Sequence, residues 1–334
     1  MSNASAAPGA FVTCLGHTRS CLIIRLHHSA FIFNMKPPPH AASPEAPLCA
    51  APDPNPRPPR LRVPRNACDT HAHICGPMAM HPYSDRRVYT PPDALLSAYR
   101  RMLETLGVER AVLVQPSVYG SDNTVMLSAM KALGKRCRGV AVVDDDVSDA
   151  EIARLHDAGV RGVRVNVVDV AVDKGVIPIE PIARLASRIR RYGWHVEFLM
   201  HADEFPDLDS TFDGFPVEIV LGHLGYLRTD RGTDDAGFRA LLRLMERGRA
   251  WVKLTGPYRI SREALPHRDT IPFARALLDA APGRVVWGTD WPHVMVKGAM
   301  PNDGDLADLL LEWVRDATLR EQVLVTNPAK LYGF

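Results

Sequence analysis

Short apolar runs alternate with longer amphipathic stretches along the chain after residue 65. The runs are rich in Val, Ile and Leu, which is typical of strands in a parallel sheet whose two faces are both covered. We count eight, at residues 67–74, 110–115, 139–144, 162–167, 195–200, 217–221, 251–254 and 285–287. The intervals between them are long enough for a helix to connect successive strands.

The intervals carry the signals of helix starts and ends. A predicted helix over residues 90–107 opens with prolines and ends at a glycine, and another covers 122–134. In a third, over 148–159, Ser148 and Glu151 have the spacing of a capping box. The other predicted helices cover residues 181–192, 235–248, 270–281 and 304–317. The alternation predicts an α/β protein, and eight strands favour a (β/α)8 TIM barrel. A doubly wound sheet is disfavoured, because no predicted strand leads into a Gly-x-Gly-x-x-Gly turn.

The chain before residue 65 has a different composition. Prolines recur from Met35 to Pro64, and proline lacks the backbone N–H that helices and sheets need. We expect residues 1–64 to be a disordered or extended, Pro-rich N-terminal leader, and residues 65–334 to form the barrel. Residues 1–34 show no periodicity and precede an internal methionine, so we interpret them as a tag or an upstream extension of the reading frame.

The charge balance excludes several kinds of partner. The 334 residues include 40 Lys and Arg and 38 Asp and Glu, a net charge of +2, so the basic excess of a nucleic-acid-binding protein is missing. The apolar stretch at residues 21–33 is interrupted by Arg25 and two histidines, and we expect no membrane span and no signal peptide. The six cysteines follow no zinc or redox spacing, which favours free thiols in a cytoplasmic protein.

Histidines and an aspartate follow the predicted strands at the point where each strand ends. The first strand carries His71 and His73, the fifth leads into His201, the sixth into His223 and the eighth into Asp290. Active sites of (β/α)8 barrels lie at these carboxyl ends, and His71 and His73 point to the same side because side chains alternate along a strand. Such a set can hold a divalent metal such as Zn²⁺ or polarise a carbonyl without one.

Several motifs resemble the amidohydrolase superfamily, of the amidohydrolase-2 type, and within it the 2-pyrone-4,6-dicarboxylate lactonase group. The resemblance runs from about residue 64 to the C-terminus. The matching stretches are Asp69 to His73, Gly76-Pro77-Met78, Tyr89-Thr90-Pro91, Val114 to Ser117, Gly120 to Asn123, Gly139 to Asp144, Arg161 to Arg164, His223-Leu224-Gly225, Lys253 to Pro257, Arg259, Trp287 to His293, and Thr326-Asn327-Pro328 followed by Leu331-Tyr332. The string from Trp287 to His293 is the most specific of them, together with Gln115-Pro116-Ser117.

The resemblance implies hydrolysis of a lactone without a metal cofactor. In that family the aspartate of the eighth strand activates water, which assigns the general base to Asp290. The family histidines polarise the lactone carbonyl, and this role carries over to His71, His73 and His223. The substrate-binding candidates that the resemblance implies are Arg164, Arg259, Ser117 and Tyr89, and His293 is a further candidate for the pocket.

Two departures from the family pattern bear on the substrate. Val170 replaces a second carboxylate-binding arginine, and Leu199 replaces a tyrosine. We therefore expect a related acidic lactone, such as a muconolactone or a sugar-acid lactone, rather than the dicarboxylate pyrone itself. His201 has no counterpart in that group, and it completes a potential site for Zn²⁺ or Mn²⁺ with His71, His73 and Asp290.

Two other functions stay open at this point. One is a metal-dependent decarboxylase of the same superfamily, which carries nearly the same residues at its strand ends. The other is a barrel that binds a carboxylate ligand without turning it over, because fold alone does not determine function. The expected partner in every case is a small acidic molecule. The sequence leaves the direction of the reaction open, and a homo-oligomer is neither required nor excluded.

Overall fold

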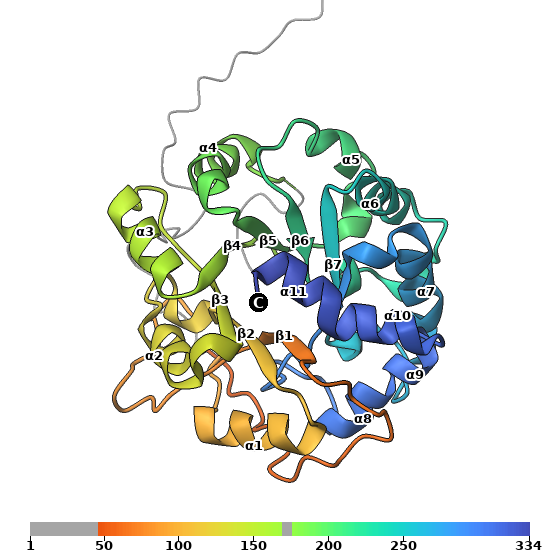
Figure 1. Ribbon diagram of the computed structural model, residues 1–334, viewed down its shortest axis with the longest axis horizontal. Coiled ribbons are helices and arrows are strands. Elements are labelled where there is room, and N and C mark those ends of the chain that lie inside the picture. Colours follow the sequence, from red (N-terminus) through yellow and green to blue (C-terminus); the bar gives the residue numbers. More distant parts are fainter. Residues whose placement is uncertain (1–45, 169–175) are drawn as a thin grey trace, which may run out of the picture.

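The computed structural model describes residues 46–168 and 176–334, and it places eight parallel strands in a ring with helices outside (Figure 1). The strands pair in the order of the sequence, from β1 to β8. They are β1 (Cys68–Ala72), β2 (Arg110–Val114), β3 (Cys137–Ala141), β4 (Val160–Asn166), β5 (His195–Leu199), β6 (Ile219–Leu221), β7 (Ala250–Leu254) and β8 (Val285–Trp287). This arrangement confirms the predicted (β/α)8 barrel.

The helices agree with the prediction in order, with corrections at their ends. The α-helices of eight residues or more are α1 (Leu96–Leu106), α2 (Thr124–Leu133), α3 (Asp149–Asp157), α4 (Ile179–Ile189), α6 (Ala236–Glu246) and α7 (Ile271–Ala280). The shorter ones are α5 (Leu208–Thr211), α8 (Asp303–Asp308), α9 (Leu310–Trp313), α10 (Ala317–Glu321) and α11 (Asn327–Tyr332). The Ser148 hydroxyl accepts the Glu151 backbone N–H at 3.1 Å, as the capping box requires.

Three predicted bounds are wrong for identifiable reasons. The helix expected from residue 90 begins only at Leu96, because Thr90 is bonded to an extended segment, with its N–H donated to the Pro47 carbonyl at 2.8 Å. The strand expected at 139–144 ends at Ala141, where the Asn123 amide takes over the hydrogen bonds of Val142. The helix expected over 304–317 is divided into α8 and α9.

The ring closes between β1 and β8 through backbone bonds and one buried carboxylate. The His73 N–H donates to the Trp291 carbonyl and the Asp290 N–H to the His71 carbonyl, both at 2.8 Å. Asp69 accepts from the Thr289 backbone N–H at 2.9 Å and from the Thr289 hydroxyl at 2.7 Å. These contacts hold His71, His73 and Asp290 side by side at the mouth.

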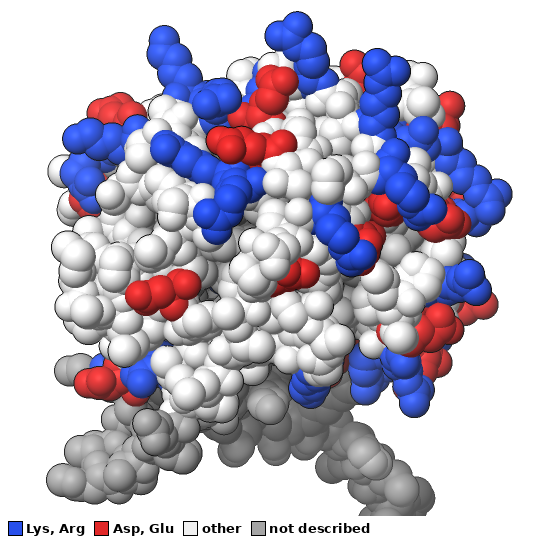
Figure 2. Space-filling model, turned by 90° about the horizontal axis from the view of Figure 1, so that it is seen from below, with Lys and Arg blue, Asp and Glu red and all other residues white. Residues whose placement is uncertain are grey.

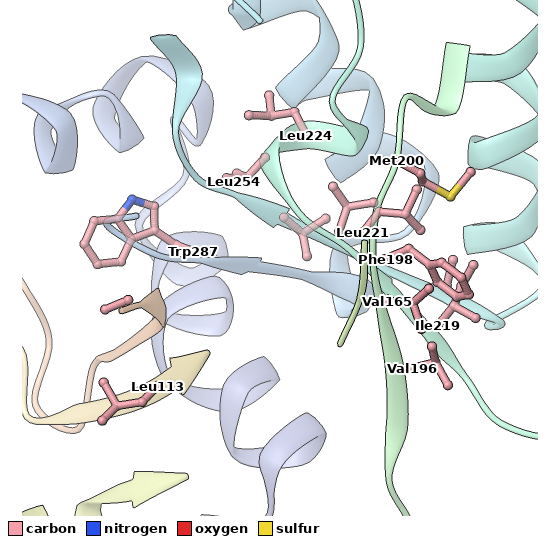
Figure 3. Packing of buried hydrophobic residues seen from close by; sticks show 14 of the residues in the cluster. Leu113, Val165, Val196, Phe198, Met200, Ile219, Leu221, Leu224, Leu254 and Trp287 are labelled. Atoms are coloured by element: carbon pink, nitrogen blue, oxygen red, sulfur yellow. The ribbon is translucent and has the colours of Figure 1, made fainter. Parts of the chain in front are cut away.

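Side chains alternate between two apolar layers along each strand. Val196 and Phe198 of β5 point outward, where they meet Ile219 and Leu221 of β6 in the layer between barrel and helices (Figure 3). Val220 lies between the last two and belongs to the separate cluster inside the barrel. By the same alternation, residue 197 of β5 and residue 253 of β7 must point into the barrel.

The C-terminal helix α11 crosses the ring in Figure 1 at the end opposite the mouth. Leu331 and Tyr332 join the cluster inside the barrel. The Phe334 ring lies 5.3 Å from the Arg110 guanidinium and 4.7 Å from that of Arg138, at the starts of β2 and β3. The amino ends of the strands are therefore covered by the chain's own C-terminus.

Residues 46–64 run in extended conformation along the barrel without helix or strand. Leu61 is buried, and its N–H donates to Asp308 of α8 at 2.8 Å. Arg60 pairs with the same carboxylate at 2.9 Å. The predictions of disorder and of a tag for earlier residues fall on positions 1–45, outside the described residues.

Charged side chains of both signs are interspersed over the face shown in Figure 2, in keeping with the small net charge. Within residues 46–168 and 176–334, no helix is both long enough and apolar enough to cross a membrane.

Candidate active site

A cavity of about 220 Å³ opens at the carboxyl ends of the strands, where the sequence predicted the reactive residues. Its lining is mostly polar and carries three cationic side chains against one carboxylate. The lining residues are His73, Tyr89, Ser117, Arg164, His223, Tyr226, Tyr258, Arg259, Asp290, Val294, Met295 and Lys297. A cavity with this balance of charge favours an anionic ligand.

Asp290 is fully buried, and its two carboxylate oxygens have different surroundings. Oδ2 accepts hydrogen bonds from the Tyr258 hydroxyl and from Arg259 Nε, both at 2.6 Å. Oδ1 has no hydrogen-bond partner among the described residues. One oxygen is thus held in place by two hydrogen bonds, while the other is buried without one.

The pKa of Asp290 lies well below its usual range. Burial by itself would raise this pKa, but the opposing charge of Arg259 and its hydrogen bond to the carboxylate outweigh it. Asp290 is therefore ionised at neutral pH, and its unbonded oxygen can accept a proton.

His73 presents an unprotonated nitrogen to the cavity. Its Nδ1 lies 2.8 Å from the Val114 carbonyl, which can only accept, so Nδ1 carries the ring proton and Nε2 carries the lone pair. Burial, and then the charge of Arg164, lowers the pKa of His73 to about 4. The ring is therefore neutral at the pH of the cell.

His223 approaches the same carboxylate from the end of β6. Its Nδ1 lies 3.9 Å from Asp290 Oδ2, and burial lowers its pKa to about 3. His223 and Asp290 both have positive φ angles, of 50° and 67°. Such conformations cost free energy in non-glycine residues and occur most often at functional sites.

His71 lies behind His73 and is almost completely buried. Its Nε2 is 3.7 Å from Asp290 Oδ1, and neither atom has a hydrogen-bond partner among the described residues. Its Nδ1 is 3.3 Å from Lys253 Nζ in hydrogen-bond geometry. An ammonium group can only donate, so Nδ1 accepts and the proton of the neutral ring is on Nε2. Burial and the nearby charge of Lys253 lower the pKa of His71 well below its ordinary value.

His71, His73 and Asp290 form a His-His-Asp group whose ligand atoms all lie within 4.8 Å of one another. This spacing suits a divalent cation. The hydrogen bonding does not, because His71 Nε2 carries a proton instead of a lone pair while Nδ1 accepts from Lys253. As the side chains are bonded here, the group does not fit a metal ion.

The predicted fourth metal ligand, His201, is not brought to this group. Strand β5 ends at Leu199, and the chain turns at once into a short 3-10 helix at Ala202–Glu204. The His201 ring stacks on Tyr226 at 4.5 Å, and its Nδ1 lies 2.8 Å from the Tyr226 carbonyl. Register at the end of the strand therefore separates His201 from the other three residues.

The substrate-binding candidates take different positions. Arg164, Ser117 and Tyr89 line the cavity, and the Ser117 hydroxyl lies 3.4 Å from that of Tyr89. Arg259 also lines it but bonds Asp290, as described above. His293 is a correction: it is fully buried behind Tyr258, outside the set of lining residues, with Nδ1 3.0 Å from the Tyr258 hydroxyl. Its Nε2 bonds Asp303 of α8 at 3.1 Å.

Sequence reasoning missed several residues of the site. Tyr226 and Lys297 lie in loops and Tyr258 in a three-residue 3-10 helix, where no periodicity distinguishes them. Glu197 and Lys253 could have been found, because each is a charged residue between apolar neighbours inside a strand. A charge at such a position must point into the barrel, where it needs a partner.

The fold and the site define a (β/α)8-barrel enzyme whose mouth holds an ionised aspartate, neutral histidines and an excess of cations. The sequence model of the amidohydrolase family matches residues 68–334, and the chain belongs to this family.

Relatives with known names share most of the chain. The 2-pyrone-4,6-dicarboxylate hydrolase of Comamonas testosteroni is 39% identical over 287 residues, 83% of this chain and 93% of that protein. The 4-sulfomuconolactone hydrolase of Rhizobium radiobacter is 36% identical over 289 residues, 86% of this chain and 96% of that protein.

A crystal structure from Acinetobacter baumannii, described as a probable 2-pyrone-4,6-dicarboxylic acid hydrolase with citric acid bound, has a TM-score of 0.71 and 25% identity. The match covers 80% of this chain and 100% of that one. The family resemblance expected from the motifs is confirmed, and the named relatives support a lactone-opening hydrolase.

Proposed function

We propose that this protein hydrolyses the ring of a small acidic lactone, with Asp290 as general base. One observation carries the proposal: Asp290 lines the cavity, its Oδ2 is held by Tyr258 and Arg259, and its Oδ1 has no hydrogen-bond partner among the described residues. A carboxylate is a weak base, so it must be close to its water and partly desolvated to act. Asp290 is fully buried, and it lines the cavity that would hold the water.

In the proposed reaction, water gives a proton to Asp290 Oδ1 while its oxygen attacks the acyl carbon of the lactone. His73 Nε2 accepts a hydrogen bond from the other O–H of that water, since it carries a lone pair and His73 lines the cavity. His71 and His223 are left to donate to the carbonyl oxygen as it gains negative charge. The ring C–O bond then breaks, and the proton on Asp290 passes to the departing ring oxygen, which releases the open hydroxy acid or its keto form.

The lining of the cavity supports an anionic substrate. Arg164, Arg259 and Lys297 supply three positive charges, of which Asp290 balances one. Arg164 and Lys297 are therefore assigned to carboxylate or sulfonate groups of the substrate, and Ser117 and Tyr89 to its polar edge. The cytoplasmic location, and the absence of nucleic-acid and membrane partners, stay predictions from the composition.

We propose that the reaction needs no resident metal. The free oxygen of an ionised Asp290 can itself accept the proton from water, and His71 offers an N–H instead of a lone pair. A site for Zn²⁺ or Mn²⁺ at His71, His73 and Asp290 is the alternative that metal analysis must test.

The experiment is a screen of lactones by acid release at constant pH. It includes a muconolactone, 2-pyrone-4,6-dicarboxylate, a sugar-acid lactone and an uncharged lactone of similar ring size. Wild type is expected to open at least one acidic lactone, and Asp290→Asn to lose about 10²- to 10⁴-fold in kcat. Asp308→Asn, which changes a buried aspartate of α8 outside the cavity, is the matched control and is expected to keep the wild-type rate.

A second comparison tests the role of the cations. Arg164→Met is expected to raise KM for the acidic lactone about tenfold or more, the effect of losing a charged hydrogen bond, and to leave the uncharged lactone unaffected. The proposal fails if no lactone is opened, or if Asp290→Asn matches wild type. Metal-dependent release of carbon dioxide from an aromatic or muconate-type acid would favour the decarboxylase instead.

A further inference from the structure

A lysine and a glutamate form an ion pair inside the barrel, directly behind His71. Lys253 of β7 is 0% exposed and Glu197 of β5 is 2% exposed. Lys253 Nζ lies 2.7 Å from Glu197 Oε2. Neither residue lines the cavity.

Burying both charges costs free energy that apolar residues in the same places would not cost. The neighbouring residues of the strands are apolar, and the Tyr332 ring of α11 lies 5.8 Å from Lys253 Nζ on the side away from the mouth. Packing alone therefore does not explain the presence of the ion pair, and its contacts with His71 point to a role at the site.

The Lys253 ammonium has three polar contacts. It donates to the Thr70 carbonyl at 2.8 Å and to His71 Nδ1 at 3.3 Å, and it forms an ion pair with Glu197 Oε2 at 2.7 Å. These contacts hold the buried ammonium against His71. Glu197 fixes its position and balances its charge.

Glu197 offers a competing acceptor to the same ring. Its Oε1 lies 3.2 Å from His71 Nδ1, a contact of ionic type, whereas Lys253 is aligned for a hydrogen bond. If Lys253 were absent, His71 Nδ1 could carry the proton and donate to Glu197. Nε2 would then present a lone pair to His73 and Asp290, which is the arrangement of carboxylate, histidine and metal found in zinc sites.

We infer that Lys253 is a positioning residue that holds His71 in the form protonated on Nε2, and thereby keeps the His71-His73-Asp290 group a metal-free donor site. Without Lys253 the same three side chains become a metal site, with Glu197 as the partner of His71. The role of the His71 Nε2–H as a donor to the substrate rests on the proposed function, but the protonation of the ring can be measured without any substrate.

The first test uses the wild-type protein. Long-range ¹H–¹⁵N spectra of ¹⁵N-histidine-labelled protein distinguish a protonated from an unprotonated ring nitrogen, and the His71 signals are assigned by their loss in His71→Gln. We expect Nε2 protonated and Nδ1 unprotonated. The opposite pattern overturns the inference, whether or not the protein opens a lactone, and failure of every lactone would leave this spectrum unchanged.

The second test compares the binding of Zn²⁺ and Co²⁺ to wild type, Lys253→Met and Lys297→Met. Lys297→Met removes a cation that lines the cavity and forms no hydrogen bond or ion pair with His71, so it controls for charge. Lys253→Met is expected to bind the metal about tenfold or more tightly than the other two, the scale on which outer partners of a ligand histidine act. It should also show the reversed ring protonation and a lower kcat with KM within about twofold, because Lys253 lies outside the cavity.

A double variant controls for misfolding caused by an unpaired buried Glu197. It also tests whether Glu197 contributes to metal binding. Glu197→Leu combined with Lys253→Met removes both charges of the pair together, and such replacements are often neutral for stability. It lacks the carboxylate partner of His71, so we expect it to bind metal more weakly than Lys253→Met. Equal metal affinity in wild type and Lys253→Met overturns the inference, and if Lys253→Met does not fold, the wild-type spectrum decides.

Discussion

Gly256 lies two residues after β7, close to the side chains of Asp290 and His223. It has a φ of +54°, and a Cβ added there would lie 2.7 Å from Asp290 Oδ2 and 2.8 Å from His223 Nδ1. Gly256→Ala therefore perturbs the site in two separable ways. It places an L-residue in the left-handed region, and it inserts a methyl group between the base and a histidine.

The two effects have different magnitudes. The left-handed conformation costs roughly 1–2 kcal/mol of stability for a residue with a Cβ. The methyl group must also displace Asp290 or His223 by roughly 0.5–1 Å to reach an ordinary contact distance, and a misplacement of about 1 Å costs on the order of 10²-fold in rate. We expect kcat to fall about 30- to 100-fold.

Gly214 supplies a matched control. It has a φ of +68°, and an added Cβ there would meet nothing within 4 Å. Gly214→Ala should carry the same backbone cost in urea unfolding but keep the wild-type kcat on the lactone found by the screen. If both variants keep kcat within about twofold, or if both lose it equally, the contact argument at Gly256 is refuted.

Three further predictions follow from the pKa directions, the donor set and the N-terminal segment. In the folded protein the pKa values of His73 and His223 are lowered to about 4 and about 3, from 6.5 in the unfolded chain. Below pH 6.5 the unfolded chain therefore binds protons that the folded protein does not, and the free energy of unfolding falls as the pH falls from 6.5 toward 4. Urea unfolding should show stability decreasing from pH 6.5 toward 4, and a midpoint independent of pH there would contradict the neutral rings. Protein purified without added metal should keep its lactone-opening rate after dialysis against a chelator, with elemental analysis confirming removal; loss of activity restored by Zn²⁺ or Mn²⁺ would favour the metal alternative. Asp308→Ala should lower stability by about 1–3 kcal/mol, because the Leu61 N–H and Arg60 lose their acceptor, while kcat stays near wild type; an unchanged thermal midpoint would show that the segment contributes nothing.

The strand pattern predicted the barrel and most of the reactive residues, because both depend on local order along the chain. His71 and His73 stand two apart on β1, and Asp290 follows β8 directly, so their meeting at the mouth follows from eight parallel strands in a ring. His201 and His293 were assigned to the site for the same reason and do not line it. Their positions depend on where a strand ends and how a loop turns, which the apolar pattern does not encode.

The sequence by itself determined the period of the strands, the residues at their carboxyl ends and the family motifs. Only the tertiary structure decided which oxygen of Asp290 is hydrogen-bonded and which nitrogen of His71 carries the proton. Asp290 Oδ2 is hydrogen-bonded and Oδ1 is not because Tyr258 and Arg259 both reach the same oxygen. The position of the proton on His71 depends on Lys253, 182 positions away. Hydrogen bonds between distant strands set these states, and no local pattern of residues specifies which strands will bring their side chains together.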